Sequence, residues 1–357
     1  MTTDRTRDMD AELETVRDIL HGDEAALSRF PEGDAVAPER FVEFAHHHRM
    51  AGFLYRTLLA DGLLGRLPDA VTGKLESWYV DQARITENRL TEARTLASAF
   101  ERAGLEVLFL KGAFLARRYY DDWRDRFTWD TDLFIRGAFD LAPVREVVLE
   151  ASYVEQSRTP FGDRAMRWFT HDVEFDRDGL PLDVHWAFGN HYSFRIDYGR
   201  VWENRRRVEF DGAEYSVLHR EDELVLTVLG TLRDVERGRL RLKSCIDLVR
   251  MLSTLEADTD WERFFQKRRT ERLDAIVPEI FAFALDLLDF RGRFHALEPY
   301  LPPAADRAGR RSAARRLQWS RYGLRNKAWA FRLYRGGRVP SVGWWLLSQP
   351  IRRLTHA

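Results

Sequence analysis

A single stretch, Leu105 to Ile135, constrains the fold of this chain more than any other. It begins with LEVLFL, a short apolar run that follows Gly104 and ends at Lys111-Gly112. A run of that length bounded by glycine predicts a buried strand. The next segment, AFLARRYYDD, predicts a helix, and FTWDTDLFI predicts a second strand. The stretch therefore indicates a strand–helix–strand unit around which the rest of the chain must pack.

The second predicted strand carries two carboxylates one residue apart, Asp130 and Asp132. Side chains alternate between the faces of a strand, so we expect both carboxylates to point one way and Thr131 the other. Two aligned carboxylates form half of a site for a divalent metal, because Mg²⁺ is usually held by one or two carboxylates together with phosphates and waters. A D-x-D pair is common by chance, so its context has to support the interpretation.

That context includes a predicted hairpin in RAMRWFTHDVEFDRDGLPLDVHWAF, where Asp178-Gly179 is a strong tight-turn signal. The second arm of the hairpin presents Asp183 and His185 on one face. Asp183 is the candidate third carboxylate.

Helical periodicity dominates on both sides of this strand-rich segment. Pro38 opens a helix at a favoured early position, and the apolar pattern continues through LYRTLLADGLL. His46, His47 and His48 in that helix spread over most of a turn, so they cannot share one metal.

We predict an α+β fold with a small mixed sheet. The predicted parts are an N-terminal helical region (1–103), a core (104–217) and a C-terminal helical domain (218–357).

Composition narrows the class of protein. The single cysteine, Cys245, excludes an intrachain disulfide and a cysteine-based metal site. The polar first residues lack the apolar core of a signal peptide, and no apolar run reaches the roughly 18 residues of a membrane span. These two observations lead us to expect a protein of the bacterial cytoplasm. The predominance of arginine over lysine also fits a GC-rich genome. The net charge of -1 excludes no partner.

The last segment, 307–357, carries many arginines and aromatic residues and no acidic residue. Three interpretations stay open. It binds nucleic acid, where cations contact phosphates and aromatic rings stack on bases. It lies on an anionic membrane surface. Or it packs as a helix on the rest of this protein, which is the interpretation we favour.

Several short motifs, in order, resemble an uncharacterised bacterial nucleotidyltransferase family of the DNA polymerase beta superfamily. Its members typically show A-x-x-H-R in an early helix, then L-K-G, then R-x-x-x-D-x-D-L, then an acidic residue followed by a hydrophobic residue, His and Trp. A later K-x-x-x-D is also similar. In this chain the motifs are AHHHR at 45–49, LKG at 110–112, Arg126 with DTDL at 130–133, LDVHW at 182–186, and KSCID at 243–247.

The resemblance implies a nucleotidyltransferase core that uses two Mg²⁺ ions and an NTP, expected to be ATP. It implies that Asp130 and Asp132 bind both metal ions and that Asp183 binds one. Such an enzyme moves NMP to an acceptor hydroxyl on a small molecule, peptide or protein and releases pyrophosphate. Lys111-Gly112 occupies the place of a phosphate-contacting Gly-Ser in the wider superfamily.

Four further residues are candidates for supporting roles. Lys243 reaches the triphosphate or lies on the surface, and Arg126 binds phosphate or braces the strand. His185 orients Asp183 or packs in the core. Asp247 is expected to pair with Lys243, because side chains four residues apart meet on a helix.

One departure from the family pattern is Trp129, which stands where a small residue is usual. On a strand it points away from the metal face, where it crowds a neighbouring helix or lines a pocket. The alternative function is a nucleotide- or nucleic-acid-binding protein that keeps the fold without turnover.

Overall fold

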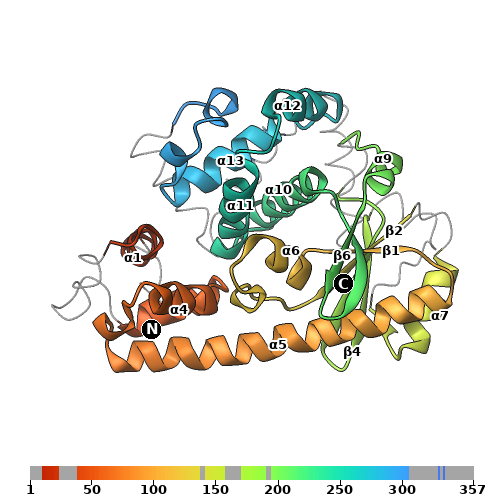
Figure 1. Cartoon of the computed structure of the whole chain (residues 1–357), viewed down its shortest axis with the longest axis horizontal. Helices are drawn as coiled ribbons and strands as arrows, with labels where there is room; N and C mark the ends of the chain where they lie inside the picture. The colour runs from red at the N-terminus through yellow and green to blue at the C-terminus, as the bar shows by residue number, and fades with distance from the viewer. Residues whose placement is uncertain are drawn as a thin grey trace.

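The computed structural model describes residues 10–23, 38–136, 141–156, 170–189 and 194–304, together with 329 and 333. The fold is α+β, with helices around a mixed sheet (Figure 1), which confirms the predicted class. The sheet has the strand order β3-β4-β5-β2-β1-β7-β6. The strands are β1 (Val107–Leu110), β2 (Thr131–Ile135), β3 (Val154–Glu155), β4 (Asp172–Arg177), β5 (Leu180–His185), β6 (Arg206–Phe210) and β7 (Ala213–Val217).

The described α-helices fall before, within and after the strand-rich segment. Before it are α1 (Asp10–His21), α3 (Pro38–His47), α4 (Ala51–Ala60) and α5 (Asp69–Arg102). Within it are α6 (Gly112–Tyr119), α7 (Ala142–Glu150) and α9 (Tyr198–Glu203). After it are α10 (Arg220–Arg237), α11 (Leu242–Leu255), α12 (Trp261–Thr270) and α13 (Ile276–Leu287). None of the described helices is both long enough and apolar enough to cross a membrane.

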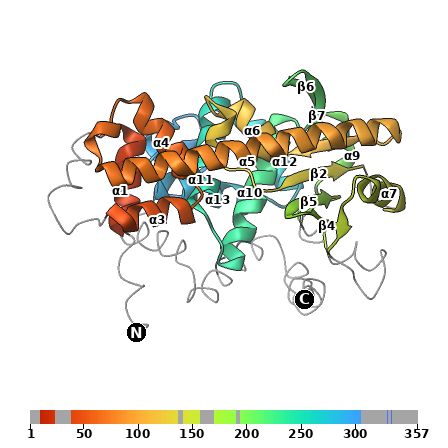
Figure 2. The same ribbon diagram turned by 90° about the horizontal axis from the view of Figure 1, so that it is seen from below.

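The long helix α5 joins the two halves of the molecule. In Figures 1 and 2 it runs from α4 at one end to the sheet and α7 at the other. Val71 and Leu75 near its start pack in the helical core, whereas Leu96 and Phe100 near its end pack against the sheet. The helix ends before Gly104, whose φ of 68° only glycine adopts readily.

The sheet core has β2 at its centre, antiparallel to β1 and parallel to β5. All residues of β1 and β2 are buried, as the apolar run LEVLFL predicts. The register aligns Asp132 of β2 with Leu110 on one side and with Asp183 on the other. Two carboxylates that are 51 positions apart in the chain thus become neighbours across adjacent strands.

The second predicted strand is shorter than the sequence pattern indicates. It was expected to include FTWD, but β2 begins at Thr131, so Asp130 lies just before the strand. The pairing explains the difference, because β1 ends opposite Asp132 and the β5 ladder begins opposite Thr131. Residues before Thr131 therefore have no partner in β1, and the next β5 residue in register, Pro181, has no backbone N–H to donate.

The predicted hairpin is confirmed, and a second one was missed. β4 and β5 pair antiparallel around Asp178-Gly179, both with positive φ. β6 and β7 pair around Asp211-Gly212 with the same backbone geometry. The same Asp-Gly signal, between VEF and AEYSV, would have located this second hairpin.

The single helix expected from Pro38 onward is two helices, α3 and α4. The break falls at Arg49, which has a φ of 57°. There the Met50 amide bonds back to the Ala45 carbonyl at 3.0 Å, closing the end of α3. Because Met50 and Ala45 are fully buried, packing of the turn outweighs the continuous helical pattern.

The helices before and after the strand-rich segment share one hydrophobic core. Phe41 and Leu54 belong to the same buried cluster as Leu248 and Phe281. The boundaries 1–103, 104–217 and 218–357 stay a prediction. The segment 307–357 lies outside the described residues except for Trp329 and Leu333, which are buried.

Candidate active site

Asp132 lies near the middle of the sheet with only 5% of its surface exposed. The Lys111 ammonium donates to its Oδ1 at 3.3 Å, and His185 Nε2 donates to the same oxygen at 2.8 Å. Burial alone would raise the pKa of Asp132, but Lys111 and the His185 hydrogen bond outweigh it and hold the pKa well below its usual range. Asp132 is therefore ionised at neutral pH.

Asp183 has the opposite electrostatic environment, although it neighbours Asp132. Burial, and then the charges of Asp132 and Asp130, raise its pKa well above the usual range. Oxygen and nitrogen atoms of Asp132, Asp183 and His185 lie within 4.8 Å of one another, close enough for a shared metal ion. The structure thus brings together two of the three predicted carboxylates and the predicted supporting histidine.

Asp130 lies apart from that cluster of potential ligand atoms but lines the same pocket as Asp132. Its side chain is partly exposed, because it precedes the strand. Its charge acts on both Asp183 and Lys243. Asp130 therefore faces the open side of the site, whereas Asp132 and Asp183 are its more enclosed carboxylates.

Lys111 and Gly112 form the sharp corner between β1 and α6. Lys111 has φ 43° and ψ -141°, a conformation that costs a non-glycine residue of order 1–3 kcal/mol. Gly112 has a φ of 52°, and a Cβ there would lie 3.2 Å from Thr128 Cγ2. Both residues line the pocket at the start of α6, where free backbone N–H groups favour anions.

A buried ionic network braces the floor of the site. Arg126 donates to both carboxylate oxygens of Asp247, at 2.8 and 2.9 Å, and to the Gly112 carbonyl at 3.3 Å. The Tyr120 hydroxyl donates to Asp247 at 2.7 Å. Lys243 Nζ lies 3.5 Å from Asp247, which confirms the expected pairing along α11. Arg126 lines the pocket, yet its guanidinium is largely engaged in this network.

Lys243 is a pocket cation whose pKa is strongly lowered. Burial, and then repulsion from Arg126, lower its pKa to about 8 in spite of Asp247 and Asp130. It lies at the start of α11, where its backbone N–H donates to the His48 carbonyl at 3.3 Å. A lysine with this pKa changes its charge close to physiological pH.

Three arginines that the sequence analysis did not assign also line the pocket: Arg49, Arg233 and Arg241. Arg233 donates to His171, and Arg241 donates to His47. Arg49 belongs to the AHHHR motif, which was the available signal for it. Arg233 and Arg241 carried no motif, because their position depends on how α10 and α11 pack.

These residues line or adjoin a pocket of about 220 Å³ that carries both signs of charge, with Asp234 and Asp247 close to its cations. We call Asp130, Asp132 and the adjoining Asp183 the acidic side. The basic side comprises Arg49, Lys111, Arg233, Arg241 and Lys243. Such a pair of surfaces can bind a polyanion together with a divalent cation.

A second cluster of potential metal ligands adjoins the first and consists of His171, Asp172 and His185. Asp172 faces His185 across the β4–β5 ladder, with 3.8 Å between Asp172 Oδ2 and His185 Nδ1. Burial would raise the pKa of Asp172, but His171, His185 and Arg233 lower it. Asp172 thus places a further carboxylate next to His185, outside the lining of the pocket.

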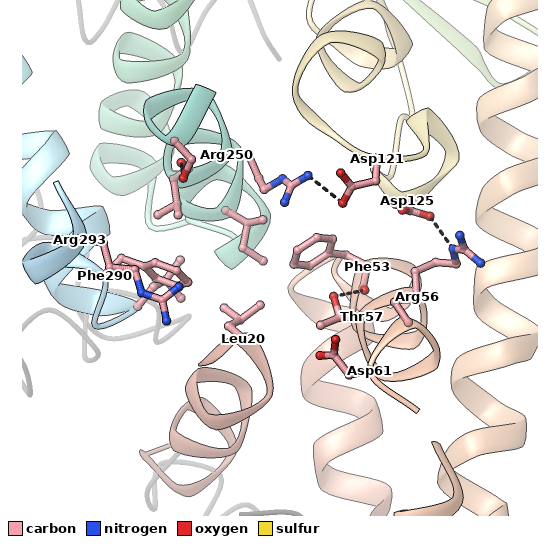
Figure 3. A pocket seen from close by; sticks show the side chains of 15 residues that line it. Leu20, Phe53, Arg56, Thr57, Asp61, Asp121, Asp125, Arg250, Phe290 and Arg293 are labelled. Atoms are coloured by element: carbon pink, nitrogen blue, oxygen red, sulfur yellow. Dashed lines mark hydrogen bonds and ion pairs between the residues drawn. The ribbon is translucent and has the colours of Figure 1, made fainter. Parts of the chain in front are cut away.

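A larger cavity of about 350 Å³ lies elsewhere, between α1, α4, α11 and the turn at Phe290 (Figure 3). Arg250 pairs with Asp121 at 3.0 Å, and Arg56 pairs with Asp125 at 3.3 Å. Neither cluster of potential metal ligands belongs to its lining. Its chemistry is therefore less suited to a metal–phosphate complex than that of the smaller pocket.

A mixed sheet whose neighbouring strands present Asp132 and Asp183 beside basic side chains is the arrangement expected for a nucleotidyltransferase core. The chain belongs to the family described as uncharacterised nucleotidyltransferases, whose family model matches residues 34–289. The match covers every strand of the sheet, both sides of the pocket and the predicted site residues. No curated protein matches the chain.

Proposed function

We propose that this protein is a cytoplasmic, Mg²⁺-dependent enzyme that transfers NMP from an NTP, ATP in our expectation, to an acceptor hydroxyl. The acceptor is a small molecule, peptide or protein, and pyrophosphate is released. The observation that carries the proposal is the pocket in which the acidic side faces the basic side. A nucleoside triphosphate bound with divalent cations matches both sides at once.

The residues of the acidic side fit magnesium. Their donors are carboxylate oxygens, which this hard cation prefers. Burial, and then the charges of Asp132 and Asp130, raise the pKa of Asp183, and a bound cation would offset the repulsion among these carboxylates. Asp130, Asp132 and Asp183 would hold the metal ions. When bound, two such ions stabilise the attacking and leaving oxygens of a phosphoryl transfer.

Side chains of the pocket bind the triphosphate, position the start of α6 and remove the proton of the acceptor. Lys111 and Lys243 bind the triphosphate and offset the charge that develops on the leaving pyrophosphate. The Arg126–Asp247 pair holds the Gly112 carbonyl, and with it the start of α6, in place. Asp183 takes up the proton of the acceptor hydroxyl as that oxygen attacks the α-phosphorus.

The direct test uses each of the four NTPs labelled at the α-phosphate, with Mg²⁺ and a lysate as the source of acceptors. We expect pyrophosphate release and a labelled product with the wild type, and neither with Asp130→Asn or Asp132→Asn. Asp178→Asn, at the exposed turn of the hairpin, is the matched control and should retain activity. The labelled product would identify the acceptor.

Two other results are informative. Binding of Mg-NTP without transfer in any lysate would favour the alternative, a nucleotide-binding protein without turnover. Absence of both binding and transfer would refute the proposed function.

A further inference from the structure

Trp129 is the one exposed residue among the Phe, Tyr and Trp side chains of the described chain, with 43% of its surface accessible. It lies directly before Asp130 and lines the same pocket. Neither the acidic nor the basic side includes it. An indole contributes little to binding phosphate or metal, so the chemistry proposed above leaves Trp129 without a role.

The position of the indole is supported by its neighbours. Trp129 and Phe127 have nearly parallel rings, with an interplanar angle of 8° and centroids 6.4 Å apart. The Arg49 guanidinium lies 5.0 Å from the centroid of Phe127. Arg49 and Phe127 also line the pocket. A fixed, partly exposed aromatic ring at the pocket edge is pre-organised for stacking.

We propose that Trp129 is the platform on which the nucleobase of the NTP stacks. The inference rests on the proposed function, because it requires the triphosphate to lie between the acidic and basic sides. Every base offers a π face, so a tryptophan platform discriminates nucleotides from base-free phosphates more than one base from another. Purines overlap the indole more fully than pyrimidines do, so purine nucleotides bind more tightly.

Two observations favour a base over a protein partner as the ligand of Trp129. The other large apolar residues exposed in the described chain are Leu59, Val80, Leu149 and Val154, all aliphatic and outside the lining of this pocket. Docking surfaces are usually contiguous apolar patches of several hundred Å². Trp129 is instead one aromatic ring beside charged groups, which is the pattern of a nucleotide site.

The test compares three ligands, each with Mg²⁺: ATP, CTP and inorganic tripolyphosphate. Affinities are measured by calorimetry on the full chain for the wild type, Trp129→Ala and Trp129→Phe. Leu59→Ala is the matched control, because Leu59 is similarly exposed, at 44%, on α4. Tripolyphosphate reports binding by the charged sides alone.

We expect Trp129→Ala to weaken ATP about 5- to 100-fold and CTP less, the range expected for the loss of one stacked base. Tripolyphosphate affinity should stay unchanged. Trp129→Phe should recover most of the ATP affinity, and Leu59→Ala should bind all three ligands as the wild type does.

Equal weakening of ATP and tripolyphosphate by Trp129→Ala, or no change in either, would overturn the inference and leave the proposed function standing. If the wild type binds neither ATP nor tripolyphosphate, both fail together. The two failures are therefore distinguishable in one set of titrations.

Discussion

The two sides of the pocket are assembled in different ways. The carboxylates of the acidic side come from the residue just before β2, from β2 itself and from the adjacent strand β5, with Asp132 and Asp183 in register. The cations of the basic side come from separate places: the end of α3, the corner before α6, α10, and the start of α11. One side is a property of two paired strands, and the other is a property of helix packing.

This difference has consequences for stability and charge. Asp132 is compensated within the site by Lys111 and His185, which keep its pKa low. Lys243 is poorly compensated, since burial and Arg126 lower its pKa to about 8. Asp132 is thus held in its charged form, whereas the charge of Lys243 varies near physiological pH. Five predictions follow, in order of expected effect.

The largest effect is expected at the acidic side. Asp132→Asn should reduce NMP transfer by about three orders of magnitude or more, because a metal-binding carboxylate supplies several kcal/mol of transition-state stabilisation. Turnover with saturating Mg-NTP measures it. The folded protein should persist by circular dichroism, since the substitution preserves shape. Near-normal turnover would mean that Asp132 does not bind the metal.

The largest loss of stability is expected when the buried pair Arg126–Asp247, which contacts Lys243 of the basic side, is broken. Asp247→Asn leaves the Arg126 guanidinium buried without its carboxylate and should cost about 3–5 kcal/mol in the free energy of unfolding. Urea denaturation measures the loss. The double variant Arg126→Met with Asp247→Leu should recover part of it, because the buried guanidinium is then removed together with its carboxylate.

A matched exposed pair provides the control for that measurement. Arg207 and Glu214 lie 2.8 Å apart, with side chains 69% and 56% exposed. Glu214→Gln should change stability far less than Asp247→Asn, because water screens exposed ions. Equal losses at the two sites would contradict the structural role of the buried network.

The pH dependence of NTP binding should originate from the basic side. If the Lys243 ammonium binds triphosphate, affinity should fall by up to about tenfold per pH unit above about 8, as the free enzyme loses that proton. Lys243→Arg should bind independently of pH in this range, because arginine stays charged. A wild-type affinity that is constant to pH 10 would exclude this role.

The same group predicts the direction of a stability change. The pKa of Lys243 is lower in the folded protein than its ordinary 10.5, so the unfolded chain binds more protons between about pH 8 and 10.5. The contribution of Lys243 to stability therefore rises with pH across that window. Lys243→Met should lack this contribution when the free energy of unfolding is measured at about pH 8 and again at about pH 10.5.

The smallest effect is expected at Gly112, in the corner between β1 and α6. Gly112→Ala should cost about 1–2 kcal/mol in stability, because its φ of 52° disfavours a side chain. Part of the cost is a contact, since the new Cβ would lie 3.2 Å from Thr128 Cγ2. Adding Thr128→Ser removes that methyl and should recover the contact part only. Complete recovery would mean that backbone strain is negligible.

The sequence by itself determined the acidic side and the elements that carry it. The apolar run before Lys111, the alternation around Asp132 and the Asp-Gly turn before Asp183 are local signals, and each predicts the strand or turn that forms. The same Asp-Gly signal was present at Asp211-Gly212. Local patterns predict local structure because backbone geometry depends on neighbouring residues.

Only the tertiary structure decided the start of β2, the break at Arg49 and the composition of the basic side. Strand length depends on which strands are available for pairing, and β1 ends opposite Asp132. Arg233 and Arg241 enter the pocket because α10 and α11 pack together and these two side chains reach His171 and His47, contacts that no short segment encodes. The apolar alternation that marks a strand is local, whereas the pairing of β2 with β5 and the approach of helices distant in sequence are set by burial of the shared core.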